Sequence, residues 1–434
     1  MRFLRKHDFT LLLCLYFFLL PVGKTLWYPL FIMAIIGGAM FFKEVRTASL
    51  EQGTKWLLGL GACIWIPAVL STPGSIDVGR SMVFVGTYPL FFLAGYFLYK
   101  RLKQGVSIVP SLYIISSIAL LWGTLAVWQY LDPTNPFGPG GSHNQGMHTP
   151  NNPYYDGGLM MGVIMGSLFA FISIGLWARG HFVIALLAGL FIVGLCWISG
   201  TRSSWVSVIT TLLALPVVAW VRGYRPSGKA YIGIFGLAAI VVLAGNWIIK
   251  QPGLNAKLNQ TLVVFQNPSF ESLDQALSGR LDIWIDAVAI GNANPWFGAG
   301  VNNYRYAAPL VDSPAGVRWI SEIDDPDSPH KLQGAAHTHQ VVMETLSGSG
   351  WIGVAGLVLF YILLARLTLN IFKHPSLLAT ATVLAFWAYF WPINTHNNFH
   401  GGWVNAWFWV WLGLSLGAYY APNMRKQQQK PVFR

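Results

Sequence analysis

The sequence predicts an all-α protein: a polytopic transmembrane helical chain with about 12 spans and one large, partly helical loop outside the membrane. Of its 434 residues, 54% are hydrophobic and only 10% are charged, whereas about 25% are charged in an average soluble domain. It contains 20 Trp and 17 Tyr, residues that concentrate at the two interfaces of a bilayer. Its apolar runs are continuous and lack the alternation of a β-barrel. An ordinary soluble enzyme and a disordered chain are therefore excluded.

Twelve apolar segments are long enough to cross, or nearly cross, a hydrocarbon core of about 30 Å. The first resembles a secretory signal, but no convincing cleavage site follows Leu20, so we expect it to remain as a span. Nine spans with a short loop at 131–156 fill residues 1–249, a large loop fills 250–346, three spans fill 347–421, and 422–434 is a basic tail. The predicted spans are 8–22, 26–42, 55–71, 78–99, 106–130, 157–176, 181–198, 204–220, 230–249, 347–369, 376–393 and 402–421.

The net charge of +12 is divided unevenly by this topology. With the N-terminus in the cytoplasm, 19 of the 28 basic residues lie on the cytoplasmic side and 13 of the 16 acidic residues lie on the outer side. The positive-inside rule is strongly satisfied. The basic excess therefore orients the protein in the membrane, and we expect no nucleic-acid partner. The three cysteines lie inside apolar runs, which disfavours a disulfide framework or a cysteine metal site.

A first candidate site is the segment 199–203 at the predicted outer end of the seventh span. It contains Arg202 beside Ser203 and a flexible glycine. A guanidinium group at this depth is suited to bind a phosphate with two parallel hydrogen bonds, where a lipid headgroup lies. The alternative is an arginine that only extends toward the membrane surface.

A second candidate site lies within the large loop, where the apolar spacing over 273–290 is near-helical. Arg280 begins the probable helix, with Ser278 as its predicted N-cap. Asp282 and Asp286 are one turn apart and permit the acid and base roles of a glycosidase. We favour the alternative that the two aspartates face solvent or pair with Arg280.

The predicted helix is followed by a Gly-Ala-Gly turn, formed by Gly298 and Gly300. Glycines at these positions permit a close approach of the backbone to a ligand. They also serve simply to shape a turn, and a lone Gly-x-Gly is weak evidence for a phosphate loop.

A third candidate site is the segment that leads into the tenth span, with His337 and His339. Histidine is the usual general base near neutral pH, and a sugar hydroxyl needs a base before it attacks an activated carbon. If the segment is helical, the two side chains point about 200° apart, so that only one of them faces a given substrate. Zinc is the alternative, but no HExxH pattern or cysteine ligand accompanies the pair, and we expect no metal.

The third segment also resembles a known signature. His339-Gln340, nine residues, Gly350, two residues and Gly353 resemble the H-[N/S/Q]-x9-G-x2-G pattern of the bacterial O-antigen ligase and polymerase superfamily. The order of features is similar too: about twelve spans, a Thr-Arg-Ser at the end of a middle span, a large periplasmic loop and then the histidine signature.

This resemblance implies a GT-C-like membrane glycosyltransferase that is metal-independent and inverting and has no cofactor. It implies an undecaprenyl-diphosphate-linked O-antigen donor and, for a ligase, a sugar hydroxyl of the lipid A core as acceptor. The motif histidine is His339, with His337 as a close competitor, and Arg202 and Arg280 match the arginines that hold the donor diphosphate. Arg305 and Arg318 match no motif of the family; together with Ser203, Gly298 and Gly300 they are further candidate substrate-binding residues.

The resemblance also implies lipopolysaccharide biosynthesis in the bacterial inner membrane, with a periplasmic active site and both termini in the cytoplasm. Within the superfamily, an O-antigen polymerase and a protein O-oligosaccharyltransferase stay open as alternatives. A transporter is the rival from a different class. The spans carry almost no ionisable residues at the midplane and no visible inverted repeat, which disfavours transport.

Overall fold

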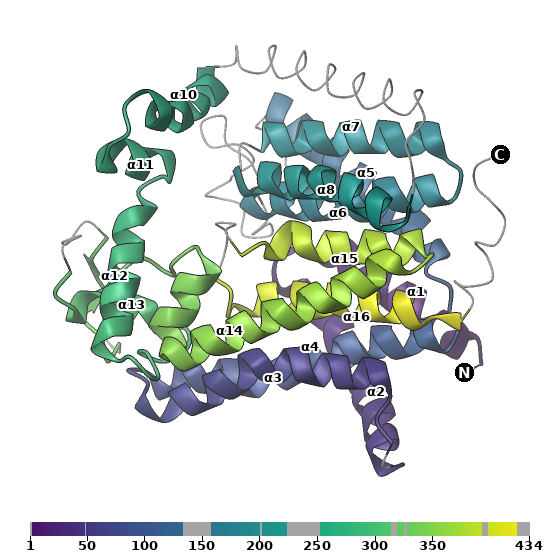
Figure 1. Cartoon of the computed structure of the whole chain (residues 1–434), viewed down its shortest axis with the longest axis horizontal. Coiled ribbons are helices and arrows are strands. Elements are labelled where there is room, and N and C mark those ends of the chain that lie inside the picture. The colour runs from purple at the N-terminus through teal and green to yellow at the C-terminus, as the bar shows by residue number, and fades with distance from the viewer. Residues whose placement is uncertain are drawn as a thin grey trace.

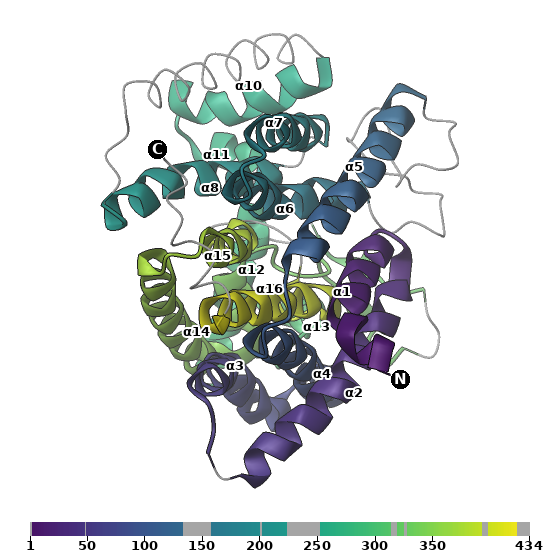
Figure 2. The same cartoon turned by 90° about the vertical axis from the view of Figure 1, so that its right-hand side faces the viewer.

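The computed structural model describes residues 2–47, 49–132, 158–199, 202–223, 252–313, 319–324, 328–392 and 398–422. Most of the long helices run side by side and form one bundle (Figures 1 and 2). The described residues between 252 and 340 gather at one end of this bundle, which we call the loop end. The helices before this region are α1 (Arg2–Leu19), η1 (Gly23–Leu26), α2 (Trp27–Arg46), α3 (Gln52–Ser71), η2 (Thr72–Gly74), α4 (Val78–Lys103), α5 (Val109–Leu131), α6 (Gly158–Ala178), α7 (Phe182–Ile198) and α8 (Arg202–Val221).

The loop end and the last helices complete the fold. A two-stranded antiparallel pair, in which Ser321 lies opposite Gln333, is the one departure from the all-α prediction among the described residues. The elements of the loop end and the last helices are α10 (Pro252–Gln266), α11 (Phe270–Ala276), α12 (Arg280–Ala293), α13 (Tyr304–Ala307), η3 (Ala308–Leu310), β1 (Ser321–Glu322), β2 (Leu332–Gln333), α14 (Val341–Lys373), α15 (Leu377–Phe390) and α16 (Gly402–Tyr420).

The fold confirms the polytopic helical class. Within the described ranges, six helices are long and apolar enough to cross a membrane, and four further apolar helices are shorter. Helices occupy eleven of the twelve predicted spans, and the ninth, 230–249, lies outside the described residues. The predicted short loop, 131–156, and the basic tail also lie almost wholly outside them.

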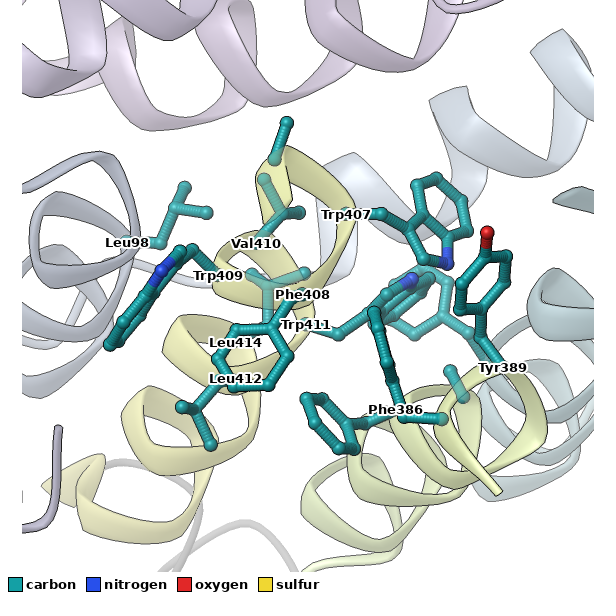
Figure 3. Close-up of a cluster of buried hydrophobic side chains, with 14 of the residues drawn as sticks. Leu98, Phe386, Tyr389, Trp407, Phe408, Trp409, Val410, Trp411, Leu412 and Leu414 are labelled. Carbon is teal, nitrogen blue, oxygen red and sulfur yellow. The ribbon is translucent and has the colours of Figure 1, made fainter. Parts of the chain in front are cut away.

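The core of the bundle is built around α16, whose Trp407, Trp409 and Trp411 are fully buried. Figure 3 shows Trp409 beside Leu98 of α4 and Trp407 beside Tyr389 of α15. Small residues allow α4 and α16 to approach closely, as is usual where helices pack within a membrane. This packing holds together the helix bundle that supports the loop end.

The direction of α8 is fixed by Arg222 at its C-terminal end. The guanidinium group of Arg222 donates hydrogen bonds to the carbonyl oxygens of Phe372 (3.0 Å) and His374 (2.8 Å) and to the hydroxyl of Thr380 (2.6 Å). The end of α8 therefore lies at the turn between α14 and α15. Its first residue, Arg202, consequently lies at the loop end, where α14 begins.

A kink in α14 joins the bundle to the loop end. Gly350 has φ 61° and ψ −159°, which interrupts the helix. The backbone groups freed by a kink need new partners. The segment 295–300 supplies them: the amide of Trp351 donates to the carbonyl of Pro295 (2.7 Å), and the amide of Ala299 donates to the carbonyl of Ser347 (2.8 Å). Because α14 begins at Val341, the boundary predicted at 347 falls inside this helix.

Candidate functional site

The two candidate histidines lie side by side in an irregular loop directly before α14. Their ring centroids are 4.0 Å apart. The helix begins only at Val341, with Gln340 as its N-cap, and His339 has a left-handed backbone with φ 58°. The helical geometry that would point the side chains in opposite directions is therefore wrong for this segment. The two imidazole rings therefore lie in contact with each other.

The histidine loop, residues 337–340, is hydrogen-bonded to several neighbouring elements. The indole nitrogen of Trp284 in α12 donates to the carbonyl of Thr338 (3.0 Å), and the side-chain amide of Gln340 donates to the carbonyl of Pro392 (2.8 Å). A non-glycine residue in the left-handed region costs roughly 1–2 kcal/mol. Such a conformation persists where its surroundings over-determine it. The arrangement of the histidine pair is therefore held by α12, α14 and the segment after α15.

The helix that carries Arg280 starts differently from the prediction. The predicted helix over 273–290 is divided into α11 and α12 by Ser278 (φ 62°) and Gly279 (φ 75°). The N-cap residue is Gly279, and no side-chain cap bond is present there, so the prediction of Ser278 as the cap is wrong. A carboxylate oxygen of Asp274 instead accepts a hydrogen bond from the amide of Leu281 (3.1 Å).

Arg280 is the first residue of α12 and is half-buried. Trp284 lies one turn later, so the two side chains share a face of the helix. Because the indole of Trp284 contacts Thr338 between the two histidines, this face is directed toward the histidine loop. The structure thus places the face of α12 that bears Arg280 and Trp284 beside the histidine loop.

Asp286 lies in the core of the loop end, where only 5% of it is exposed. Burial raises the pKa of its carboxyl, and the charge of Asp282 raises the pKa further, while a hydrogen bond with Ser313 lowers it. The preferred prediction, an aspartate that faces solvent or pairs with Arg280, does not describe Asp286. It packs beside Tyr304, whose hydroxyl donates to the carbonyl of Ile283 (3.1 Å).

The two glycines of the predicted turn allow other segments of the protein to pack closely against the turn. Gly298 has φ 63°, and a Cβ atom there would lie 2.6 Å from the carbonyl oxygen of Ser347 in α14. Gly300 has φ 96° and lies against Ser75 in the turn between α3 and α4. Both positions therefore require glycine for packing. A contact with substrate at either glycine stays a prediction.

Arg202 and Ser203 begin α8. The side chain of Ser203 is buried. Further along the same helix, the hydroxyl of Ser207 donates to the carbonyl of Ala388 near the end of α15 (2.6 Å). The chain just beyond α15 holds Gln340 through Pro392, so the start of α8 and the histidine loop are attached to the same end of α15. This connection places the backbone of Arg202 on the side of the bundle where the histidines lie.

Of the remaining candidates, Arg318 lies outside the described residues. Arg305 is in α13, where its carbonyl accepts a hydrogen bond from the amide of Gly334 (2.6 Å). The buried Nε atom of Arg305 has no hydrogen-bond partner among the described residues. Nearby, the ring of Tyr306 stacks on His330 with centroids 4.0 Å apart.

Sequence reasoning gave no role to Trp284, Thr338 or Glu344, although all three support the histidine loop. The available signal is Gln340, because an N-cap there starts the helix at Val341 and leaves Thr338 outside it. The contact with Trp284 spans 54 positions of the sequence and has no local signature.

His400 is buried beside the rings of Phe84 (centroids 5.0 Å apart) and Phe399. His396, one helical turn earlier in the sequence, lies outside the described residues. Burial lowers the pKa of His400 from its usual 6.5 to about 3. The folded state thus resists protonation of this imidazole, whereas the unfolded state accepts a proton near pH 6.5. Its contribution to stability is complete above pH 6.5 and is lost progressively as the pH falls toward 3.

We expect His400→Phe to reduce the acid sensitivity of the fold. The wild type should lose more of its thermal midpoint between pH 7 and pH 5 than the variant does, as measured by intrinsic fluorescence in detergent. His181→Phe, at an exposed position bonded to Tyr113, is the matched control and should retain the wild-type slope. Equal pH dependence of His400→Phe and the wild type would refute this assignment.

Among the described residues, no group of three or more His, Cys, Asp or Glu side chains is arranged to hold a metal ion. In a comparison with known families, residues 186–358 match the family model described as O-Antigen ligase. No curated protein matches the chain. The matched range contains Arg202, Arg280, the histidine loop and the kink at Gly350.

Proposed function

We propose that this protein acts as an O-antigen ligase, because residues 186–358 match the O-Antigen ligase family model, which supports a membrane glycosyltransferase of the ligase and polymerase type. Its donor is an O-antigen glycan on undecaprenyl diphosphate, and its acceptor is a sugar hydroxyl of the lipid A core. The observation that carries the proposal is the contact between His337 and His339 beside the face of α12 that bears Arg280.

The chemistry requires one proton acceptor and one stabiliser of negative charge. The imidazole of His339 removes the proton of the acceptor hydroxyl as its oxygen attacks the anomeric carbon. The bond from that carbon to the diphosphate oxygen breaks, and its electron pair leaves with undecaprenyl diphosphate. Attack opposite the leaving group inverts the anomeric configuration.

The guanidinium groups of Arg202 and Arg280 hold the diphosphate. Each offers a planar fork that matches phosphate oxygens, and both stabilise the charge that grows as the leaving group departs. A diphosphate is already a good leaving group, so this scheme requires no metal in principle. The lipid tail stays among the helices while the glycan lies at the loop end. The charge division of the sequence supports a periplasmic loop end in the inner membrane, with both termini in the cytoplasm.

The acceptor is tested with purified protein, one undecaprenyl-diphosphate glycan and three separate acceptors. We expect extension of core lipid A, observed as a shift of the glycolipid on gels and confirmed by mass spectrometry. Extension of a second lipid-linked glycan would instead make the protein a polymerase, and glycosylation of a pilin would make it a protein oligosaccharyltransferase. Movement of the glycan across proteoliposomes without any transfer would favour a transporter.

The proposed diphosphate contact predicts a graded effect at Arg280. Arg280→Ala removes a donor that acts on the leaving group and should lower kcat by about 10²-fold. Arg280→Lys retains the charge but lacks the planar guanidinium group, so its kcat should lie between those of the wild type and Arg280→Ala. Arg179→Ala, in the turn between α6 and α7 at the opposite end of the bundle, is the control. Wild-type kinetics of Arg280→Ala with a purified lipid-linked donor would contradict this role.

A further inference from the structure

We propose that Glu344 is the positioning residue of the histidine pair, acting through Thr338. The inference rests on the proposed function, because it assumes that the histidines do the chemistry. It assigns a task to a buried carboxylate that the transfer scheme itself leaves unused.

One carboxylate oxygen of Glu344 accepts two hydrogen bonds from the same residue. The amide of Thr338 and the hydroxyl of Thr338 each donate to Oε2 over 2.9 Å. Both residues are buried, with 3% of Glu344 and 0% of Thr338 exposed. Thr338 lies between the two histidines in the chain, so fixing it from two directions restrains the backbone on both sides.

The third polar group of Thr338 is held from a different element. Its carbonyl accepts the indole hydrogen bond of Trp284. The amide and the hydroxyl of Thr338 are therefore bonded to Glu344 of α14, the hydroxyl lies also 3.0 Å from the carbonyl oxygen of Gln340, and the carbonyl is bonded to α12. A residue that is hydrogen-bonded at all three groups has little freedom to rotate, so the backbone of His337 and His339 on either side of it is also restrained.

Two features indicate that this arrangement serves the histidines rather than folding alone. A buried carboxylate is expensive to desolvate, and an apolar side chain of similar volume often stabilises a fold equally well. In addition, the arrangement holds His339 in the left-handed region, which a relaxed loop would avoid. Such strain is typical of sites where a fixed geometry is required. The geometry that results is the close contact of the two imidazole rings.

The first test compares two substitutions with identical chemistry. Thr338→Val removes the hydroxyl that bonds Glu344 and the carbonyl of Gln340, whereas Thr345→Val removes a hydroxyl that donates to the carbonyl of Val341 within α14. We expect Thr338→Val to lower kcat by at least about tenfold, because small displacements of a reacting group slow the chemical step. KM for the donor should stay within about threefold of the wild type. Thr338→Ser restores the hydroxyl and should recover most of kcat, and Thr345→Val should behave as the wild type.

The second test reads the histidines without any transfer assay. The rates at which diethyl pyrocarbonate modifies His337 and His339, mapped by mass spectrometry, should change in Thr338→Val and stay unchanged in Thr345→Val. If the wild type transfers no glycan to any acceptor, the proposed function fails, and this measurement still decides the positioning claim. Unchanged modification rates together with unchanged kcat in folded Thr338→Val would overturn it. Should Thr338→Val not fold, Trp284→Phe releases the carbonyl of Thr338 and is judged by the same two readouts.

Discussion

His339→Ala is expected to lower kcat for glycan transfer by about 10²–10⁴-fold, the usual contribution of a positioned general base. KM for the lipid-linked donor should change little, because the imidazole acts on the acceptor proton and not on the diphosphate. The measurement is a steady-state transfer assay with purified protein and core lipid A. His181→Ala, on an exposed side chain that bonds Tyr113 away from the loop end, is the control and should retain full activity.

The matching variant at His337 decides which ring is the base. With the rings 4.0 Å apart, each is close enough to reach a hydroxyl bound at the other, so His337→Ala should reduce kcat by a smaller factor. A larger loss in His337→Ala than in His339→Ala would move the base to His337. Full activity of the double variant would exclude a histidine base altogether.

Gly350→Ala is expected to destabilise the protein by about 2–4 kcal/mol, from backbone strain and lost hydrogen bonds at the kink. Its φ of 61° and ψ of −159° fall in a region that only glycine adopts readily. A Cβ atom there would also lie 2.5 Å from the carbonyl oxygen of Pro295 and 2.6 Å from that of Trp296. The free energy of unfolding, or the thermal midpoint in detergent, is the quantity to compare with the wild type.

The control for this variant is Gly59→Ala in α3. A Cβ atom at Gly59 meets nothing within 4 Å, and alanine is the better helix former, so stability should be unchanged or slightly higher. Because 295–300 continues directly from α12, Gly350→Ala should also disturb Arg280 and reduce transfer in the fraction that folds. A thermal midpoint equal to that of the wild type would contradict the claim that the close packing and backbone hydrogen bonds between α14 and 295–300 stabilise the protein.

The membrane helices were predictable because their apolar runs are long and nearly free of charge. The boundary at the start of α14 was not, because its first turns carry Thr345, Ser347 and Ser349 and read as polar. Their hydroxyls bond backward to the helix or pack inside the protein, where hydropathy has no information. The kink at Gly350 was equally hidden, since one of three nearby glycines, Gly348, Gly350 and Gly353, does not by itself reveal a partner from another segment.

The local structure around the candidate residues was predictable only in part. Arg280 does begin a helix, but the cap at Ser278 was wrong because Asp274, from the preceding helix, bonds the first turn. A helical segment would point His337 and His339 in different directions, but Gln340 starts that helix after them. The support from Glu344 depends on that start position and on no local pattern.

The most direct test of the central claim is the product of one reaction: undecaprenyl-diphosphate glycan and core lipid A, incubated with the reconstituted wild-type protein. The account predicts a glycan joined to the core sugar with an anomeric configuration inverted relative to the donor, together with one undecaprenyl diphosphate released per transfer. A product of retained configuration, or donor consumed with no new glycosidic bond, would contradict it.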